Sequence, residues 1–384
     1  MNKKIKIGIL AIACAQMGTM AFTPCIGGMA AAFPDAPTVY VQLILSIPAM
    51  IGCITGILAG RLSNKIPMKY TACLGLLIMV LTGIWASTAQ SMLTLVISST
   101  VMGLGIGTIG TVCAALCNFY FEGAENEKLM GYITTAGCLG GMAMVTAGGY
   151  LAEISWRYNF LIYLVLIIII VIALVTLPAD IVKENKGNEI KGKVTISGAA
   201  IGYAAILIPV MICYNSFPAN ISMYTGEVGL GNSVAAGYST MIFLFAGVVG
   251  GFIFGKYCQI SGRLSLGVSI ILGGLGFLLM IGLPNTITIM LGCFIVGLGM
   301  NFFIPGCIVG AGTSSDTVSA PTAIAIAMAT CNVGQFLSSI VLNPAAEMTG
   351  NSSAYMRYLI SAIGLIVIGI LVSALFMMRK KEAQ

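Results

Sequence analysis

Long apolar runs limit this chain to one kind of fold. Residues 71–89, 158–178 and 358–378 read TACLGLLIMVLTGIWASTA, YNFLIYLVLIIIIVIALVTLP and YLISAIGLIVIGILVSALFMM. A helix needs about 20 apolar residues to cross the hydrocarbon core of a bilayer. A membrane β-barrel would instead show alternating strands of about 10 residues. The sequence therefore predicts an all-α polytopic membrane protein.

The composition agrees with this prediction and excludes several kinds of site. Hydrophobic residues make up 58% of the chain and charged residues 8%, whereas about a quarter of a soluble domain is charged. Histidine, the commonest metal ligand and the usual proton carrier near neutral pH, is missing. Almost all of the 12 cysteines lie singly in the apolar runs, so we expect packing residues rather than disulfides or metal ligands. We expect no cofactor.

The first 32 residues share features with a secretory signal peptide. MNKKIKIGILAIACAQMGTMAFTPCIGGMAAA has a basic start, an apolar middle and a small-residue end. Its apolar part is longer than that of a typical signal peptide, and many apolar runs follow. We therefore expect it to remain as the first membrane helix.

The apolar runs divide into twelve predicted membrane spans, which places both termini on the same side of the bilayer. These spans cover residues 7–32, 39–60, 69–89, 92–118, 129–152, 157–178, 195–217, 233–256, 264–283, 286–311, 321–346 and 355–378.

The basic residues predict which side that is. Of the 18 Lys and Arg residues, only Arg157 and Arg357 fall on one side of the predicted arrangement, and all others fall on the opposite side. Basic loops stay in the cytoplasm. The sequence thus predicts a multi-pass protein of the plasma (cytoplasmic) membrane with both termini cytoplasmic.

One polar segment of some length divides the chain. PADIVKENKGNEIKGKV, residues 178–194, separates six predicted spans from the next six. We therefore predict an N-terminal six-helix bundle at 1–178, a cytoplasmic linker at 179–194 and a C-terminal six-helix bundle at 195–384.

The two predicted halves resemble each other in sequence. VMGLGIGTIG, beginning at Val101, is similar to IVGLGMNFFI, beginning at Ile295, so that Gly103 and Gly105 align with Gly297 and Gly299. WRY at 156–158 is echoed by MRY at 356–358, and GRLSNKIPMK at 60–69 by GKYCQISGRL at 255–264. Two parallel six-helix repeats are one architecture of secondary transporters.

On these motifs the chain resembles the major facilitator superfamily over all twelve spans. That family's loop between spans 2 and 3 usually reads Gly-x-Leu-Ala-Asp-Arg-x-Gly-Arg-Arg/Lys. Gly60, Leu62, Lys65 and Lys69 fit it, whereas Asn64 replaces its acidic residue. Ser99 stands where proton-driven members commonly carry an arginine, so the likeness to proton-coupled drug exporters is incomplete.

The resemblance implies a gating role for the two loops, with topology and packing alone as the alternative. A glycine at the end of a span permits close helix approach, and the cations can meet helix C-termini or carboxylates. The gating residues are Gly60, Arg61, Asn64, Lys65, Lys69, Gly255, Gln259, Gly262 and Arg263.

Charged residues are missing from the middle of every predicted span. A charged substrate would need an opposite charge near its path, so we predict a neutral or amphiphilic small organic substrate that is bound by neutral polar and aromatic side chains. Such side chains can instead join helices, worth about 0.6–2 kcal/mol each. We expect prolines to interrupt helices near these side chains, at Pro24, Pro48, Pro209 and Pro305. The predicted substrate contacts are Gln16, Tyr214, Asn215, Asn301, Phe302, Asn332 and Gln335.

The leading interpretation is a secondary transporter that works by alternating access, with export favoured. The alternative is a facilitator or symporter for uptake of a small polar metabolite. A non-transporting sensor would be expected to carry an added cytoplasmic domain, whereas this sequence ends soon after span 12. A membrane enzyme would need a catalytic set, which the sequence lacks.

The net charge of +6 follows from the basic inner loops, so we expect no nucleic-acid partner. We expect a monomer in the lipid bilayer; the substrate, direction and coupling ion stay open.

Overall fold

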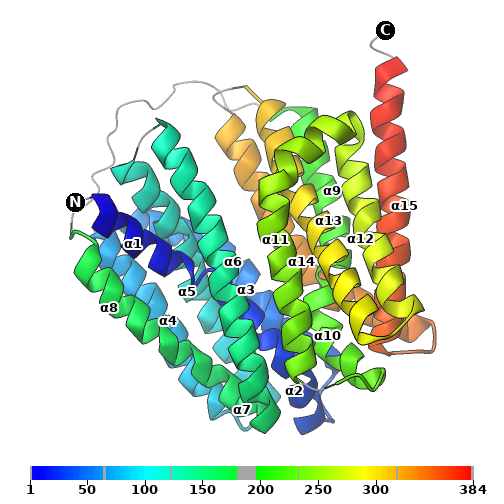
Figure 1. The fold of residues 1–384 in the computed structure, drawn as a ribbon, viewed down its shortest axis with the longest axis horizontal. Coiled ribbons are helices and arrows are strands. Elements are labelled where there is room, and N and C mark those ends of the chain that lie inside the picture. The colour runs from blue at the N-terminus through cyan, green and yellow to red at the C-terminus, as the bar shows by residue number, and fades with distance from the viewer. Residues whose placement is uncertain are drawn as a thin grey trace. The chain divides into compact units, whose positions relative to one another are not determined.

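The computed structural model describes residues 2–63, 66–121, 123–179, 196–231, 233–316 and 319–381. Every regular element in these ranges is a helix (Figure 1). Twelve helices or helix series are long and apolar enough to cross a membrane, as predicted. The all-α fold with twelve spans is therefore confirmed. Most of the predicted linker, residues 180–194, lies outside the described ranges.

The chain divides into two compact units. Unit 1 is Met1–Gly187 with Gly231–Met241. Its first and sixth spans are series of short helices, whereas its other spans are single helices. The elements are α1 (Asn2–Ala13), the 3-10 helix η1 (Gly18–Cys25), α2 (Ile26–Ala32), α3 (Thr38–Ser63), α4 (Met68–Ser87), α5 (Met92–Tyr120), α6 (Gly123–Ile154), α7 (Trp156–Asn159), the 3-10 helix η2 (Phe160–Val165) and α8 (Leu166–Thr176).

Unit 2 is Asn188–Leu230 with Ile242–Gln384. The seventh span of the chain, which is the first of this unit, consists of two helices joined at Asn215. The elements that follow the linker are α9 (Gly198–Tyr214), α10 (Ser216–Glu227), α11 (Ser233–Ser261), the 3-10 helix η3 (Gly262–Leu264), α12 (Ser265–Gly282), α13 (Thr286–Thr313), α14 (Ala320–Met348) and α15 (Ala354–Lys381).

Glycines bring α3 and α5 into backbone contact in unit 1. Both helices carry a Gly-x-x-x-Gly pattern, at Gly52 and Gly56 and at Gly103 and Gly107. A Cβ added to Gly52 would lie 3.4 Å from the backbone nitrogen of Gly107. The hydroxyl of Thr55 also donates to the Gly103 carbonyl at 3.3 Å. In a membrane, such small residues let helices approach closely enough for dispersion contacts to hold them together.

The glycines that the sequence repeat pairs make matching contacts in the two units. A Cβ at Gly297 would lie 2.6 Å from the Phe243 carbonyl oxygen of α11, just as Gly103 faces α3. A Cβ at Gly105 would lie 2.6 Å from the Gly75 oxygen of α4, and one at Gly299 would lie 2.7 Å from a backbone oxygen of α12. The repeat in sequence is therefore a repeat of helix contacts.

The prolines interrupt helices less than expected. Pro24 lies in η1, but Pro48, Pro209 and Pro305 lie inside the continuous helices α3, α9 and α13. The expectation was wrong for these three. A proline removes one backbone hydrogen bond, and neighbouring groups in a membrane bundle can satisfy the carbonyl that is left.

The seventh span continues beyond its predicted end at residue 217. The chain restarts as α10 and runs to Glu227. Pro218 lies in the first turn of α10, where the backbone N–H groups have no partner within the helix. A proline at that place begins a helix rather than ending one, so the apolar pattern alone gave too short a span.

We predict that Gly107→Leu destabilises unit 1. A Cβ at Gly107 would collide with the backbone oxygen of Gly52 and the hydroxyl of Thr55. Overpacking of this kind typically costs about 1–3 kcal/mol. Thermal unfolding of the purified protein in detergent measures the loss. Gly110→Leu on the same helix is the control, because no atom lies within 4 Å of a Cβ there. Equal midpoints for both variants would contradict the close α3–α5 contact.

Candidate functional site

The first span unwinds near its middle. After α1 ends at Ala13, the Gln16 nitrogen donates to the Ala13 oxygen at 3.0 Å and the Gly18 nitrogen to the Ala15 oxygen at 3.1 Å. This three-residue spacing is that of a 3-10 helix, which continues as η1. A change of helix type leaves carbonyl groups without their usual partners, and hydrocarbon supplies none.

Side chains from the sixth span satisfy these carbonyls. The hydroxyl of Tyr163 donates to the Gly18 oxygen at 2.6 Å, and the Asn159 amide donates to the Ala21 oxygen at 2.8 Å. Both donor side chains are fully buried. The ring of Phe22 also packs against Tyr163, with centroids 5.7 Å apart. The irregular part of the first span is thus held by hydrogen bonds from the side chains of Asn159 and Tyr163.

The seventh span is held in the same way. It breaks at Asn215, and the hydroxyl of Tyr358 on α15 donates to the Phe217 oxygen at 3.0 Å. Tyr358 is fully buried, like Tyr163. We call Tyr163 and Tyr358 the clamp tyrosines. In each unit a tyrosine from the sixth span of that half therefore bonds to the broken first span.

Three predicted contact residues lie on α14 and at the break beside it. The Asn215 amide donates to the Gln335 backbone oxygen at 3.0 Å, and the Ser338 hydroxyl donates to the Ile212 oxygen at 2.7 Å. Asn215 is buried, whereas Asn332 and Gln335 are half-buried. We call Asn215, Asn332 and Gln335 the carboxamide group. The structure thus brings Asn215 and Gln335 into direct contact.

The remaining predicted contacts of unit 2 have defined neighbours. Tyr214 is fully buried, and its hydroxyl donates to the Ser269 oxygen at 2.8 Å. Phe302 stacks on Tyr257 with centroids 4.1 Å apart and planes 10° from parallel. The half-buried Asn301 donates to the Gly297 oxygen at 2.8 Å. These contacts fix the orientation of each side chain, and a substrate contact by any of them stays a prediction.

Gln16 lies in unit 1, in the unwound stretch after α1. It is half-buried, and a Cβ at Gly137 of α6 would lie 3.4 Å from its Oε1 atom. Its side chain therefore faces α6. Its role as a substrate contact also stays a prediction.

The predicted gating residues are described in part. Gly60 and Arg61 belong to the last turns of α3, whereas Asn64 and Lys65 lie outside the described residues. Lys69 is half-buried in the first turn of α4. In unit 2, Gly255 and Gln259 are exposed on α11, and Gly262 and Arg263 begin η3. Gly262 has φ +51°, a left-handed conformation that favours glycine and turns the chain toward α12.

Sequence reasoning missed the burial of Arg357. Its side chain is only 3% exposed, although it lies in the first turn of α15. Nη1 donates to Asn220 Oδ1 at 2.9 Å, and Nη2 donates to the Ser352 oxygen at 2.7 Å. Glu227, at the end of α10, accepts from the Ala354 nitrogen at 2.7 Å. The sequence signal that could have indicated a buried partner for Arg357 was the polar stretch around Asn220, which lies in an otherwise apolar chain.

A hollow lies in unit 1 where α1 and α6 begin. Lys6 Nζ and Glu125 Oε1 form an ion pair at 2.6 Å. With Lys128, Leu129 and Tyr132 they line a space of about 480 Å³. The ion pair is partly exposed, so water screens it and it contributes little to stability.

The described residues offer no metal centre. No group of three Cys, Asp or Glu side chains among them could hold a metal ion. All twelve cysteines are free, and each is buried or half-buried. Their use as apolar packing residues stays a prediction.

Comparison with known proteins identifies the family. The sequence profile of the Major Facilitator Superfamily matches residues 8–339. A sequence comparison with curated proteins finds no match.

Solved structures share the fold at low sequence identity. The nucleoside transporter NupG is 16% identical, with a TM-score of 0.76, over 98% of this chain and 99% of its own. The POT family transporter PepTSo is 11% identical, with a TM-score of 0.73, over 100% of this chain and 99% of its own. At such identities the likeness shows the fold alone.

We predict that Arg357→Gln lowers stability. The change removes the hydrogen bonds that the Arg357 guanidinium donates to Asn220 Oδ1 and the Ser352 oxygen, at a cost of about 1–3 kcal/mol. Thermal unfolding in detergent measures this cost. Lys256→Gln, an exposed basic residue of the same unit, is the control and should change stability by less than about 0.5 kcal/mol. An Arg357 variant as stable as the wild type would show that the bonds are dispensable.

Proposed function

This chain belongs to the Major Facilitator Superfamily, and we propose on that premise that it is a secondary transporter. It moves a neutral or amphiphilic small organic molecule by alternating access, with export favoured. The observation that carries the substrate class is the uncharged middle of the described spans. In the described spans, charged residues lie at or near the span ends.

The carboxamide group is the proposed polar contact set. Asn332 and Gln335 are half-buried on one face of α14, three residues apart, beside the break in the seventh span. Carboxamides offer donors and acceptors without charge. The broken backbone nearby is tolerated where protein lines it, which is the usual setting of transport sites. A neutral ligand with a few polar groups fits these partners.

The packing within each unit supports alternating access. Backbone contacts at glycines and the clamp tyrosines tie the spans of a unit together. Packed cores and interfaces switch between discrete arrangements rather than deforming continuously, so rigid-body movement is the expected response. We propose that the halves 1–178 and 195–384 are the moving bodies. The loops at 60–69 and 255–264 are the proposed gates.

The distribution of basic residues supports an orientation. We propose a plasma-membrane protein with both termini in the cytoplasm, since the basic loops then stay inside. The apolar character of the predicted lining, which includes Phe302 stacked on Tyr257, favours amphiphiles and therefore export. We propose a monomer, and assign no coupling ion.

Uptake of a small polar metabolite is the second candidate. The observation that favours it is that Asn332 and Gln335 are only half-buried, although Gln335 Nε2 also donates to Cys331 Sγ at 3.7 Å. The structural neighbour NupG is a nucleoside transporter, so nucleosides belong in any ligand screen.

We predict that Asn332→Ala and Gln335→Ala weaken substrate binding without lowering folded yield. A thermal-shift screen of the purified protein against neutral amphiphiles, nucleosides, sugars, amino acids and organic acids supplies the ligand. At about 100 times its Kd a ligand adds about 2.7 kcal/mol of stability. Loss of one hydrogen bond, worth about 0.5–1.5 kcal/mol, should raise the Kd about 2- to 12-fold. Counterflow in liposomes then tests transport of the same ligand.

Thr330→Ala is the matched control on α14, because its hydroxyl bonds to the Ile326 oxygen of its own helix at 3.1 Å. It should bind like the wild type. Unchanged affinity in both carboxamide variants would assign these residues to packing. Stabilisation by organic anions alone would overturn the neutral substrate class.

We predict that the carboxylates at span ends do not couple transport to protons. Asp35, Glu153, Glu227 and Glu347 are all exposed. Exposed carboxylates of this kind do not line a site inside a unit. Changing all four to amides should leave the pH dependence of flux into liposomes unchanged. The amide oxygen introduced by Glu227→Gln can still accept a hydrogen bond from the backbone nitrogens at the start of α15. A variant that no longer accumulates substrate against a proton gradient would contradict this.

A further inference from the structure

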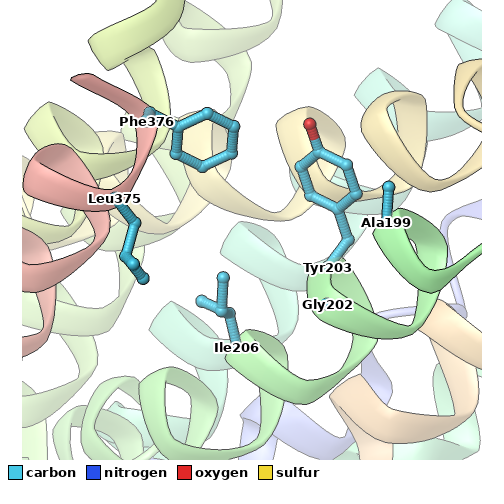
Figure 2. A pocket seen from close by; sticks show the side chains of 6 residues that line it. All are labelled: Ala199, Gly202, Tyr203, Ile206, Leu375 and Phe376. Carbon is cyan, nitrogen blue, oxygen red and sulfur yellow. The ribbon is translucent and has the colours of Figure 1, made fainter. Parts of the chain in front are cut away.

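An apolar groove lies between α9 and α15 of unit 2. Ala199, Gly202, Tyr203 and Ile206 line it from α9, and Leu375 and Phe376 line it from α15. Figure 2 shows side chains of both helices around the same space, with the rings of Tyr203 and Phe376 on facing sides. Their centroids are 6.1 Å apart. The groove is part of neither the carboxamide group nor the proposed gates.

The groove opens on a face of α15 that suits lipid. Four apolar residues spaced by one turn are exposed along this helix, which identifies a continuous ridge. The exposed fractions are 53% for Ile363, 49% for Val367, 58% for Leu371 and 55% for Leu375. In a membrane span, exposed apolar side chains contact acyl chains. Leu375 belongs both to this ridge and to the groove, so hydrocarbon reaches the groove directly.

The size of the groove suits part of an acyl chain. Its volume is about 140 Å³. Apolar cavities of about 150 Å³ hold a benzene ring, so several methylene groups fit. Gly202 has no atom within 4 Å of an added Cβ, which means that the missing side chain leaves this space open.

The sequence of α15 adds charge at the adjoining end. Arg379 and Lys380 follow Leu375 and Phe376 by four residues, about one helical turn, and the helix runs to Lys381. In the orientation proposed above, on which this step rests, that end meets the cytoplasmic leaflet, where anionic lipids concentrate. We propose that the groove binds an acyl chain of an anionic phospholipid whose phosphate lies at the basic end of α15.

The test uses the full chain in neutral detergent, titrated with phosphatidylglycerol or with phosphatidylcholine of identical acyl chains. Native mass spectrometry and thermal shift report binding. The wild type should prefer phosphatidylglycerol. Arg379→Gln with Lys380→Gln should weaken its binding about 25-fold, roughly fivefold for each cation removed, and abolish the preference. These changes lie at a helix end and test the proposal even where a groove variant fails to fold.

Gly202→Leu fills the groove and should reduce phosphatidylglycerol binding about tenfold. Gly251→Leu on α11 is the matched control, because its added Cβ also meets no atom within 4 Å. Equal affinity for the two lipids in the wild type would overturn the proposal. A Gly202→Leu variant that binds lipid normally would also overturn it. If the wild type is a dimer and Gly202→Leu only makes it monomeric, a second copy of the chain occupies the groove, and the proposal is likewise wrong. Lipid binding is measured without substrate, so a failure to bind lipid does not contradict the transport proposal. A ligand screen that finds no substrate likewise does not contradict the lipid proposal.

Discussion

Backbone hydrogen bonding in hydrocarbon is the constraint on which the rest of this structure depends. The bilayer offers no partner for a peptide group, so every span must satisfy its own. Most spans do so as continuous helices, even through Pro48, Pro209 and Pro305. The first, sixth and seventh spans are not single continuous helices. In the first and seventh spans, irregular carbonyls accept bonds from buried side chains of the same unit, which allows irregular backbone in the interior of a membrane protein.

Glycine contacts complement these bonds by fixing the distances between helices. In water, burial of apolar surface would drive helices together, but lipid tails are as apolar as the side chains they would replace. Close approach at Gly103, Gly105, Gly297 and Gly299 supplies dispersion contacts instead. The same contacts recur in both units. A bundle held by backbone approach has little freedom to deform, and this property suits a unit that is proposed to move as one body.

The number and positions of the spans followed from the sequence because the length of the apolar runs reports them directly. The repeat was also visible, since the paired glycines stand at matching helix contacts. The break at Asn215, the bonds of the clamp tyrosines and the burial of Arg357 were not predictable in the same way. Each depends on a partner more than 100 residues away, such as Asn220 for Arg357 and Gln335 for Asn215. Hydropathy describes one segment at a time and contains no information on such pairs.

The clamp tyrosines also bear on how the two halves diverged. Tyr358 is the tyrosine of the MRY triplet, but its counterpart in WRY, Tyr158, is not the clamp of unit 1; that residue is Tyr163. Descent from one ancestral half would place the same bond on the same position. The bond in unit 1 instead comes from Tyr163, five residues after Tyr158. Both halves thus use a buried tyrosine for the same physical purpose at positions that the matching triplets do not pair, so alignment alone understates how alike they are.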